Sequence, residues 1–109
     1  MIHIYEDMVD DMNYAEDVYV HDGVNYFYKG TLTGNLSTGE NVLLVVPGVV
    51  KGNIYMGKNS ILNAAGVLDE GKIYLNEGVY VDLCGIVDSL KLNGGFFDLN
   101  CMLKGEIEE

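Results

Sequence analysis

The sequence predicts an all-β protein, a single-stranded parallel β-solenoid with three sides and about 18 residues in each coil. Three observations predict it. The stretch VVKGNIYMGKNSILNAAG, from Val49 to Gly66, recurs with one inserted residue as VLDEGKIYLNEGVYVDLCG, from Val67 to Gly85. Aliphatic residues recur in files at this spacing, and glycines recur at fixed positions between them. Such a repeat buries its inner face only by stacking on the next repeat.

Residues 1–17 are expected to form an acidic N-terminal cap or a first irregular coil, and residues 18–109 the regular solenoid, within one domain. Ile2 and Ile4 alternate with polar residues as in a short strand. Met8, Met12 and Ala15 instead have helix-like spacing, so a capping helix is the alternative. We favour a strand followed by an irregular cap, because the open end of a solenoid needs a polar terminal unit.

The first side of each coil is predicted to be a strand with an inner and an outer face in period two. One inner file contains Val18, Leu36, Ile54, Ile73 and Leu90. A second inner file, two residues later, contains Val20, Thr38, Met56, Leu75 and Leu92. The outward position between them holds Tyr19, Ser37, Tyr55, Tyr74 and Lys91.

The second side is predicted to follow a corner at Gly23, Gly78 or 94–95, where glycine supplies a positive φ. Its inner file is predicted to be Val24, Val42, Ile61, Val79 and Phe96. A further corner, at Gly30, Gly48, Gly66 and Gly85, leads to the third side. Three corners per coil predict a three-sided prism with sides of about five or six residues, and about six coils in all.

The handedness of the solenoid stays open between two forms. A left-handed hexapeptide helix also has three sides of six residues. That helix requires aliphatic residues where Gly30, Gly48 and Gly66 stand, so the glycine file favours a right-handed solenoid.

The run Gly48 to Ile54, with its echoes at 31–36, 67–73 and 103–107, resembles the repeat of bactofilins, which are polymer-forming bacterial cytoskeletal proteins. The resemblance covers residues 18–109. It implies a right-handed triangular β-helix of about six coils that assembles head to tail into filaments without a nucleotide. The acidic ends and the abundant tyrosines depart from the family's pattern.

The net charge of −11 is concentrated at the two ends of the chain. Residues 1–22 contain seven acids and no lysine, residues 106–109 contain three acids, and the body between them is nearly neutral. A chain without arginine and with this balance is not expected to bind nucleic acid, which is held by Lys and Arg contacts to phosphates. With no long apolar run and no basic leader, we expect a soluble cytoplasmic protein without a membrane span.

The sequence contains no recognisable catalytic arrangement, cofactor motif or metal-ligand spacing, so we expect a protein that is not an enzyme and holds no cofactor or metal. His3 and His21 are expected to be surface residues. Cys84 and Cys101 lie about one coil apart, so a disulfide is sterically conceivable, but packed thiols are expected in a reducing cytosol.

Two surfaces are candidates for partner binding. One is the acidic end, formed by Glu6, Asp7, Asp10, Asp11, Glu16 and Asp17. The other is the outward row of Tyr19, Tyr55 and Tyr74, with Tyr26, Tyr28 and Tyr80 expected on an adjacent side. These surfaces favour a non-enzymatic binder that occupies a basic site on a protein partner, as a phage-type inhibitor of a host nucleic-acid (defence) enzyme would. A bactofilin-like scaffold that assembles with itself is the alternative.

Overall fold

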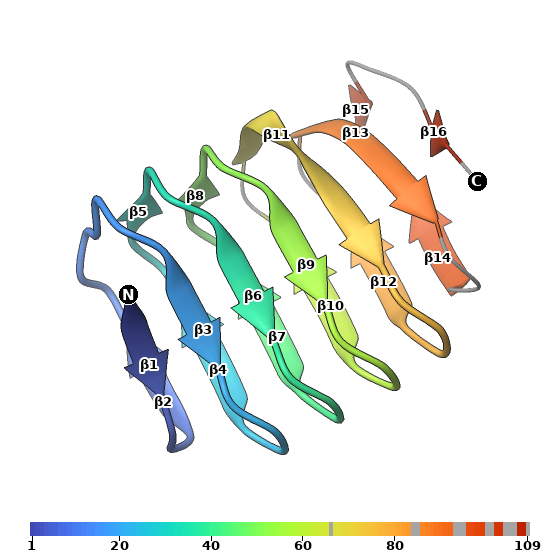
Figure 1. Ribbon diagram of the computed structural model, residues 1–109. Helices are drawn as coiled ribbons and strands as arrows, with labels where there is room; N and C mark the ends of the chain where they lie inside the picture. The colour runs from blue at the N-terminus through green and yellow to red at the C-terminus, as the bar shows by residue number, and fades with distance from the viewer. Residues whose placement is uncertain (66, 84–85, 93–95, 100–101, 104–106, 109) are drawn as a thin grey trace.

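The computed structural model describes residues 1–65, 67–83, 86–92, 96–99, 102–103 and 107–108, and side chains for residues 1–65 and 72–82. Within this part of the chain the regular structure consists of β-strands, and every strand pair is parallel. Successive coils stack on one another to form a β-solenoid (Figure 1). The prediction of an all-β solenoid is therefore confirmed.

The described strands form two sheets, and each coil contributes strands to both. The larger sheet contains β1 (Ile2–Ile4), β3 (Val18–Val20), β6 (Leu36–Thr38), β9 (Ile54–Met56), β11 (Val67–Leu75), β13 (Ile86–Leu92), β15 (Met102–Leu103) and β16 (Ile107–Glu108), joined by β5 (Thr31–Leu32) and β8 (Val49–Val50). The smaller sheet contains β2 (Met8–Asp10), β4 (Asn25–Tyr28), β7 (Leu43–Val46), β10 (Ile61–Ala64), β12 (Tyr80–Leu83) and β14 (Phe96–Leu99).

The strand register gives the length of each coil. Val18 pairs with Leu36, Leu36 with Ile54, Ile54 with Ile73, and Ile73 with Leu90. From Val18 to Leu90 the chain thus completes about four turns, about 18 residues apart. The first of the two inner files predicted from the sequence is therefore correct.

The N-terminal segment pairs with the coil that follows it. Ile2 pairs with Val18, Met8 pairs with Tyr26, and an isolated bridge joins Tyr14 to Leu32. Residues 1–17, which we call the first coil, therefore extend the stack with two short strands, and the capping helix is not formed. β1 and β2 each lie at the end of their sheet in the described chain.

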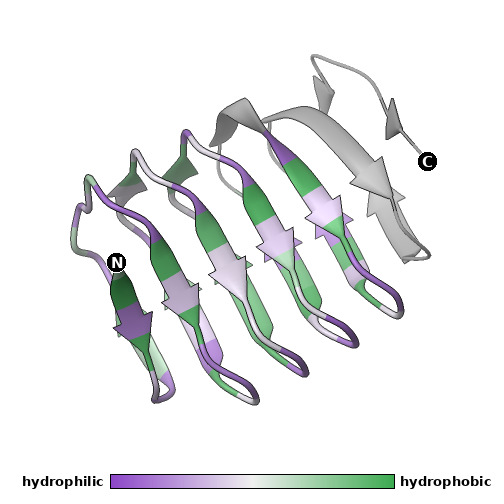
Figure 2. Ribbon diagram, in the orientation of Figure 1, coloured by the Kyte–Doolittle hydropathy of each residue, from purple (hydrophilic) through white to green (hydrophobic). Residues whose placement is uncertain are grey.

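The core lies inside the coils and is built from the alternating residues of each strand. Val18, Leu36, Ile54 and Ile73 are each at most 1% exposed, and Val20, Met56 and Leu75 at most 3%. Figure 2 shows the same alternation of hydrophobic and hydrophilic residues along the strands. Burial of each large aliphatic side chain contributes about 1.5–3 kcal/mol, so the inner files supply most of the stabilisation.

The predicted inner file of the second side is correct at Val24, Val42 and Val79, which are buried, and wrong at Ile61 and Phe96. Ile61 is 45% exposed, and Phe96 pairs with the outward Tyr80 rather than with Val79. Ser60 takes the inner position, only 1% exposed, because its hydroxyl accepts the Val42 N–H and donates to the Gly39 carbonyl. A small polar residue can occupy the core here because its hydrogen bonds are satisfied.

One corner of the coil has a left-handed backbone in four successive coils. Gly23 and Gly78 have φ of 75° and 74°, as the sequence predicts, and Asn41 and Asn59 fill the same corner with φ of 57° and 58°. Asn is the residue other than Gly that most readily adopts this conformation. Residues 94–95 lie outside the described part of the chain.

The corner at Gly30 and Gly48 needs glycine for a different reason. A Cβ at Gly48 would collide with the carbonyl oxygen of Gly30, and a Cβ at Gly30 would collide with the carbonyl oxygen of Met12. The coils therefore approach each other backbone to backbone at this corner. Gly66 and Gly85 of the same predicted file lie outside the described residues.

Candidate functional site

The acidic residues of the first coil fall into two groups, and the first group holds coils together. Asp7 Oδ1 accepts the N–H of Asn25 at 2.8 Å, and Asp17 Oδ1 accepts the N–H of Asn35 at 2.9 Å. The Asn35 Oδ1 accepts the N–H of Asn53 in the same way, at 2.8 Å. Asp17 therefore begins a ladder that asparagine continues, and its acceptor oxygen is used within the solenoid.

Asp10 belongs to the same group and is 3% exposed. Its Oδ2 accepts the hydroxyl groups of Tyr14 and Tyr26 at 2.7 and 2.8 Å, and its Oδ1 accepts the Met12 N–H at 3.0 Å. The structure thus uses this carboxylate to close the N-terminal end of the core, with little surface left for a partner.

The pKa values in this cluster follow from burial and these hydrogen bonds. Burial raises the pKa of Asp10, but the hydrogen bonds from Tyr14, the Met12 N–H and Tyr26 outweigh it and lower the pKa below 3.8. Burial and the Asp10 carboxylate raise the pKa of Tyr14 to about 12. Burial and Asp10 also raise the pKa values of Tyr26 and Tyr28.

The second group of acids is available to a partner. Glu6 and Asp11 are exposed, and no hydrogen bond or ion pair of their side chains is found among the described residues. Glu16 Oε1 lies 2.9 Å from the N-terminal amine of Met1, in an ion pair whose members are about half exposed. An exposed pair of this kind contributes little stability.

The first coil also carries a concentration of exposed apolar side chains. Met1, Tyr5, Val9 and Met12 are 60–67% exposed, and the other large apolar side chains of the described residues are at most 45% exposed. These four side chains and the exposed acids share one coil. We call this surface the first-coil face.

The first-coil face also presents unpaired backbone groups. His21 N–H donates to the Ile4 carbonyl, and Gly39 N–H donates to the Val20 carbonyl one coil later. Tyr5 holds the equivalent position in the first coil, and no acceptor for its N–H is found in the part of the chain the structure describes. The same holds for Asp11. The Lys29 N–H donates to the Asp10 carbonyl of the preceding coil, whereas Asp11, the equivalent residue of the first coil, has no preceding coil, and no acceptor for its N–H is found among the described residues. Unpaired strand edges of this kind readily accept another strand.

The outward tyrosine row is divided by Ser37. Tyr55 and Tyr74 stack with ring centroids 4.8 Å apart and an interplanar angle of 6°. Tyr19 is separated from them, because Ser37 stands between it and Tyr55 in the register. The structure therefore brings together two of the three candidate tyrosines and places the third with the first coil.

The expectation that Tyr26 and Tyr28 lie on the surface is wrong. They are 0% and 1% exposed, because their rings fill the core while their hydroxyl groups reach Asp10 and the Met12 carbonyl. Tyr80 does lie on the surface, 45% exposed. The spacing could have shown this, because Tyr26 and Tyr28 follow the inner Val24 by two and four residues. Side chains two residues apart on a strand point to the same face.

Tyr19 belongs to an aromatic and imidazole cluster that sequence reasoning did not single out. His3 Nδ1 lies 3.0 Å from His21 Nε2, within hydrogen-bonding distance. Tyr5 stacks on His21 with centroids 4.1 Å apart, and Tyr19 contacts His21 edge-on at 4.8 Å. The pairing of Tyr19 with His3 across β1 and β3 brings these rings together.

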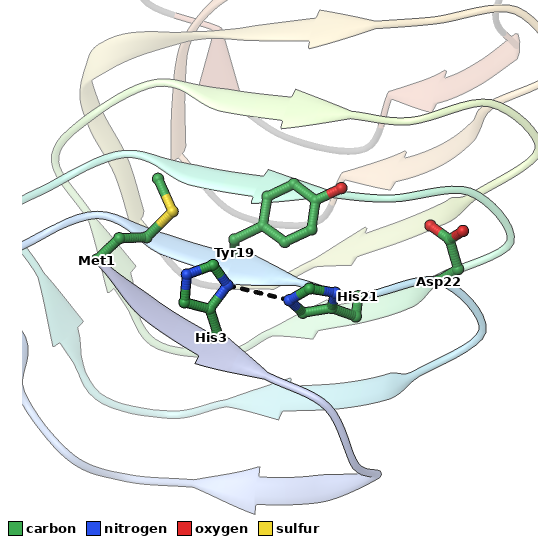
Figure 3. Close-up of a pocket in the computed structure, with 5 residues that line it drawn as sticks. All are labelled: Met1, His3, Tyr19, His21 and Asp22. Atoms are coloured by element: carbon green, nitrogen blue, oxygen red, sulfur yellow. Dashed lines mark hydrogen bonds between the residues drawn. The ribbon is translucent and has the colours of Figure 1, made fainter.

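An open surface hollow of about 530 Å³, which we call the cavity, lies beside this cluster and is lined by Met1, His3, Tyr19, His21 and Asp22. Figure 3 shows the Met1 and Asp22 side chains at opposite ends of the row, with the three rings between them. The Asp22 Oδ1 accepts the Glu40 N–H at 2.9 Å. No hydrogen bond to its Oδ2 is found among the described residues.

The remaining residues of interest give no site. No group of three or more His, Cys, Asp or Glu side chains that could hold a metal ion is found within the described residues. Cys84 and Cys101 lie outside them. The described part of the chain also contains no helix with the length and apolar character that a membrane crossing requires.

Comparison with known proteins adds no assignment. No protein-family model, no curated protein and no solved structure matches this chain. The first-coil face and the cavity beside it are therefore the candidate functional surfaces.

Proposed function

We propose that this chain is a non-enzymatic binding protein whose first-coil face occupies a basic site on a partner protein. The observation that carries the proposal is the coincidence of exposed apolar side chains and free acids on one coil. Met1, Tyr5, Val9 and Met12 are the most exposed apolar side chains of the described residues, and the exposed Glu6 and Asp11 belong to the same coil. Apolar anchors within a charged rim are typical of protein interfaces.

The charge indicates the chemistry of the partner. With seven acids and no lysine or arginine in residues 1–22, this end attracts a positively charged surface. Clustered carboxylates can replace phosphates in a groove that binds nucleic acid. We therefore propose, as the class of partner, a nucleic-acid enzyme of the cytoplasm, which a phage-type inhibitor would block.

We also propose a more detailed architecture than the strand pairing alone gives. We infer a three-sided, right-handed prism of about six coils. Three strands per coil, as in β3, β4 and β5, support three sides. The pairs Ile2 with Val18 and Leu90 with Ile107 support one further coil beyond each end of the four central turns.

The test compares two double lysine variants, one in the first coil and one at corresponding positions of later coils, where Ala65 corresponds to Asp11 in the strand register. Glu6 and Glu77 each follow the last residue of a first-side strand, β1 or β11, by two positions, and Lys58 follows β9 by the same two. Lysine is thus accommodated at this position in a regular coil. We expect Glu6→Lys with Asp11→Lys to abolish capture of the partner from a bacterial lysate, and Glu77→Lys with Ala65→Lys to retain it. Loss of capture with both double variants, or with neither, would refute the role of the first-coil face.

Self-assembly is the second candidate, because the unpaired N–H groups of Tyr5 and Asp11 could pair with another copy. The acidic ends oppose it, since stacking would bring like charges within a Debye length of about 8–10 Å. Light scattering across a salt series separates the two functions. A species of constant small size is expected for the binder, and filaments at physiological salt would favour the scaffold.

A further inference from the structure

The cavity beside the first coil is lined by groups that suit a cation. The rings of His3, Tyr19 and His21 line it, and Asp22 contributes a carboxylate. One oxygen of that carboxylate is engaged by the Glu40 N–H, which fixes the side chain, and the other can accept from a ligand. A fixed carboxylate beside aromatic faces is a favourable environment for a cation.

The charge around the cavity also favours a cationic ligand. Met1 lines the cavity, and its positively charged N-terminal amine pairs with Glu16 at 2.9 Å. Residues 1–22 contain no lysine or arginine, so the acids of this segment leave a negative potential around the cavity.

From these observations we propose that the cavity formed by Met1, His3, Tyr19, His21 and Asp22 receives an arginine side chain of the partner. Arginine fits better than lysine, because a planar guanidinium can stack on aromatic rings while one of its N–H groups donates to the remaining oxygen of the Asp22 carboxylate. The inference rests on the proposed function and names the partner group that this side of the first coil recognises.

The repeat supplies variants that test the cavity without disturbing the fold. Asp22→Asn keeps an Oδ1 that can accept the Glu40 N–H but removes the charge. Tyr19→Ser reproduces the residue that stands one coil later, Ser37, in the same outward position. Tyr55→Ser is the matched control, since it removes a ring from the same file outside the cavity.

The experiment is an NMR titration of the full chain with N-acetyl-arginine methylamide at pH 8, with EDTA in the buffer to exclude trace metal ions. We expect saturable shifts at Tyr19, His21 and Asp22, with a dissociation constant on the order of 1 mM. The neutral citrulline analogue should give none, and the lysine analogue should bind more weakly. Asp22→Asn and Tyr19→Ser should each weaken binding roughly five-fold or more, and Tyr55→Ser should not.

Equal responses to arginine and citrulline, no response to arginine, or full binding by Asp22→Asn would overturn the arginine site. Its failure is distinguishable from failure of the proposed function. If partner capture is lost with Glu6→Lys and Asp11→Lys but persists with Asp22→Asn and Tyr19→Ser, the first-coil face binds the partner and the cavity does not take its arginine.

Discussion

The Asp17 carboxylate accepts a hydrogen bond from the backbone N–H of Asn35, its equivalent one coil later, at 2.9 Å. Asn35 does the same for Asn53, and Asn53 for Lys72, at 2.8 and 2.9 Å. An acid at the end of the solenoid and asparagines inside it thus perform one task. What this task uses is an acceptor oxygen, and it does not need the negative charge.

Asp17→Asn should therefore fold as the natural protein does, whereas Asp17→Ala should lose about 1 kcal/mol of unfolding free energy because the Asn35 N–H loses its acceptor. Urea unfolding monitored by circular dichroism gives both values. If asparagine proved as costly as alanine, the carboxylate would have to be needed for its charge.

Asp10 and Asp11 are neighbours with different roles, so the same substitution should have different effects. Asp10→Asn should cost about 2 kcal/mol, because an amide cannot accept all the hydrogen bonds that Tyr14, Tyr26 and Met12 donate. Asp11→Asn should change stability by less than about 0.5 kcal/mol, as expected of an exposed site. Equal costs in urea unfolding would contradict the assignment of Asp10 to the core.

Stability should fall at alkaline pH because of the tyrosines around Asp10. The pKa of Tyr14 is raised from 10.0 to about 12, so its contribution is complete below pH 10 and is lost as the pH rises toward 12. Tyr26 and Tyr28, whose pKa values are also raised, act in the same direction. Urea midpoints measured between pH 9 and 12 should fall, and Tyr14→Phe should show a shallower fall from a lower starting value. An identical slope in the variant would exclude Tyr14 as a cause.

Stability should also fall at acid pH, because of Asp10. Its pKa lies below 3.8 in the folded protein, so its stabilising contribution is present above pH 3.8 and is lost as the pH drops through the lowered value. In a urea series from pH 5 to 2, Asp10→Asn should remove this part of the acid dependence. A pH profile parallel to that of the natural protein would show that other carboxylates cause it.

The corner at Gly23 permits a test of backbone conformation alone. Nothing lies within 4 Å of a Cβ placed there, and the equivalent Asn41 and Asn59 adopt φ of 57° and 58°. Gly23→Asn should therefore be nearly neutral, whereas Gly23→Val should cost about 1–2 kcal/mol from the left-handed backbone. Thermal or urea unfolding would show the difference, and equal losses would point to a steric cause.

The sequence was sufficient to predict the inner files of the first side and the left-handed glycines Gly23 and Gly78. Alternating aliphatic residues at an 18-residue spacing have few other solutions, and Ile54 and Ile73 pair as this predicts. It was not sufficient where a polar residue is buried. Ser60, Asp10, Tyr26 and Tyr28 resemble surface residues, and their burial depends on partners that only the stacked coils bring within reach.

The candidate site was predictable in position and less so in composition. Charge segregation located the acidic end correctly, but charge alone could not separate the exposed Glu6 from Asp7, whose oxygens bond to Asn25. His3 and His21 are 18 residues apart, the length of a regular coil, but the first coil is two residues shorter at β1, since Ile2 pairs with Val18, so His3 pairs with Tyr19 and meets His21 diagonally. That difference in coil length cannot be seen in the regular repeat.

The most direct test of the account is amide hydrogen exchange of this protein, free and in complex with its captured partner. If the first-coil face is the binding surface, the N–H groups of Tyr5 and Asp11 should exchange more slowly in the complex, while those around Tyr55 and Tyr74 are unchanged. Protection confined to the Tyr55 and Tyr74 side, with Tyr5 and Asp11 exchanging as in the free protein, would contradict it.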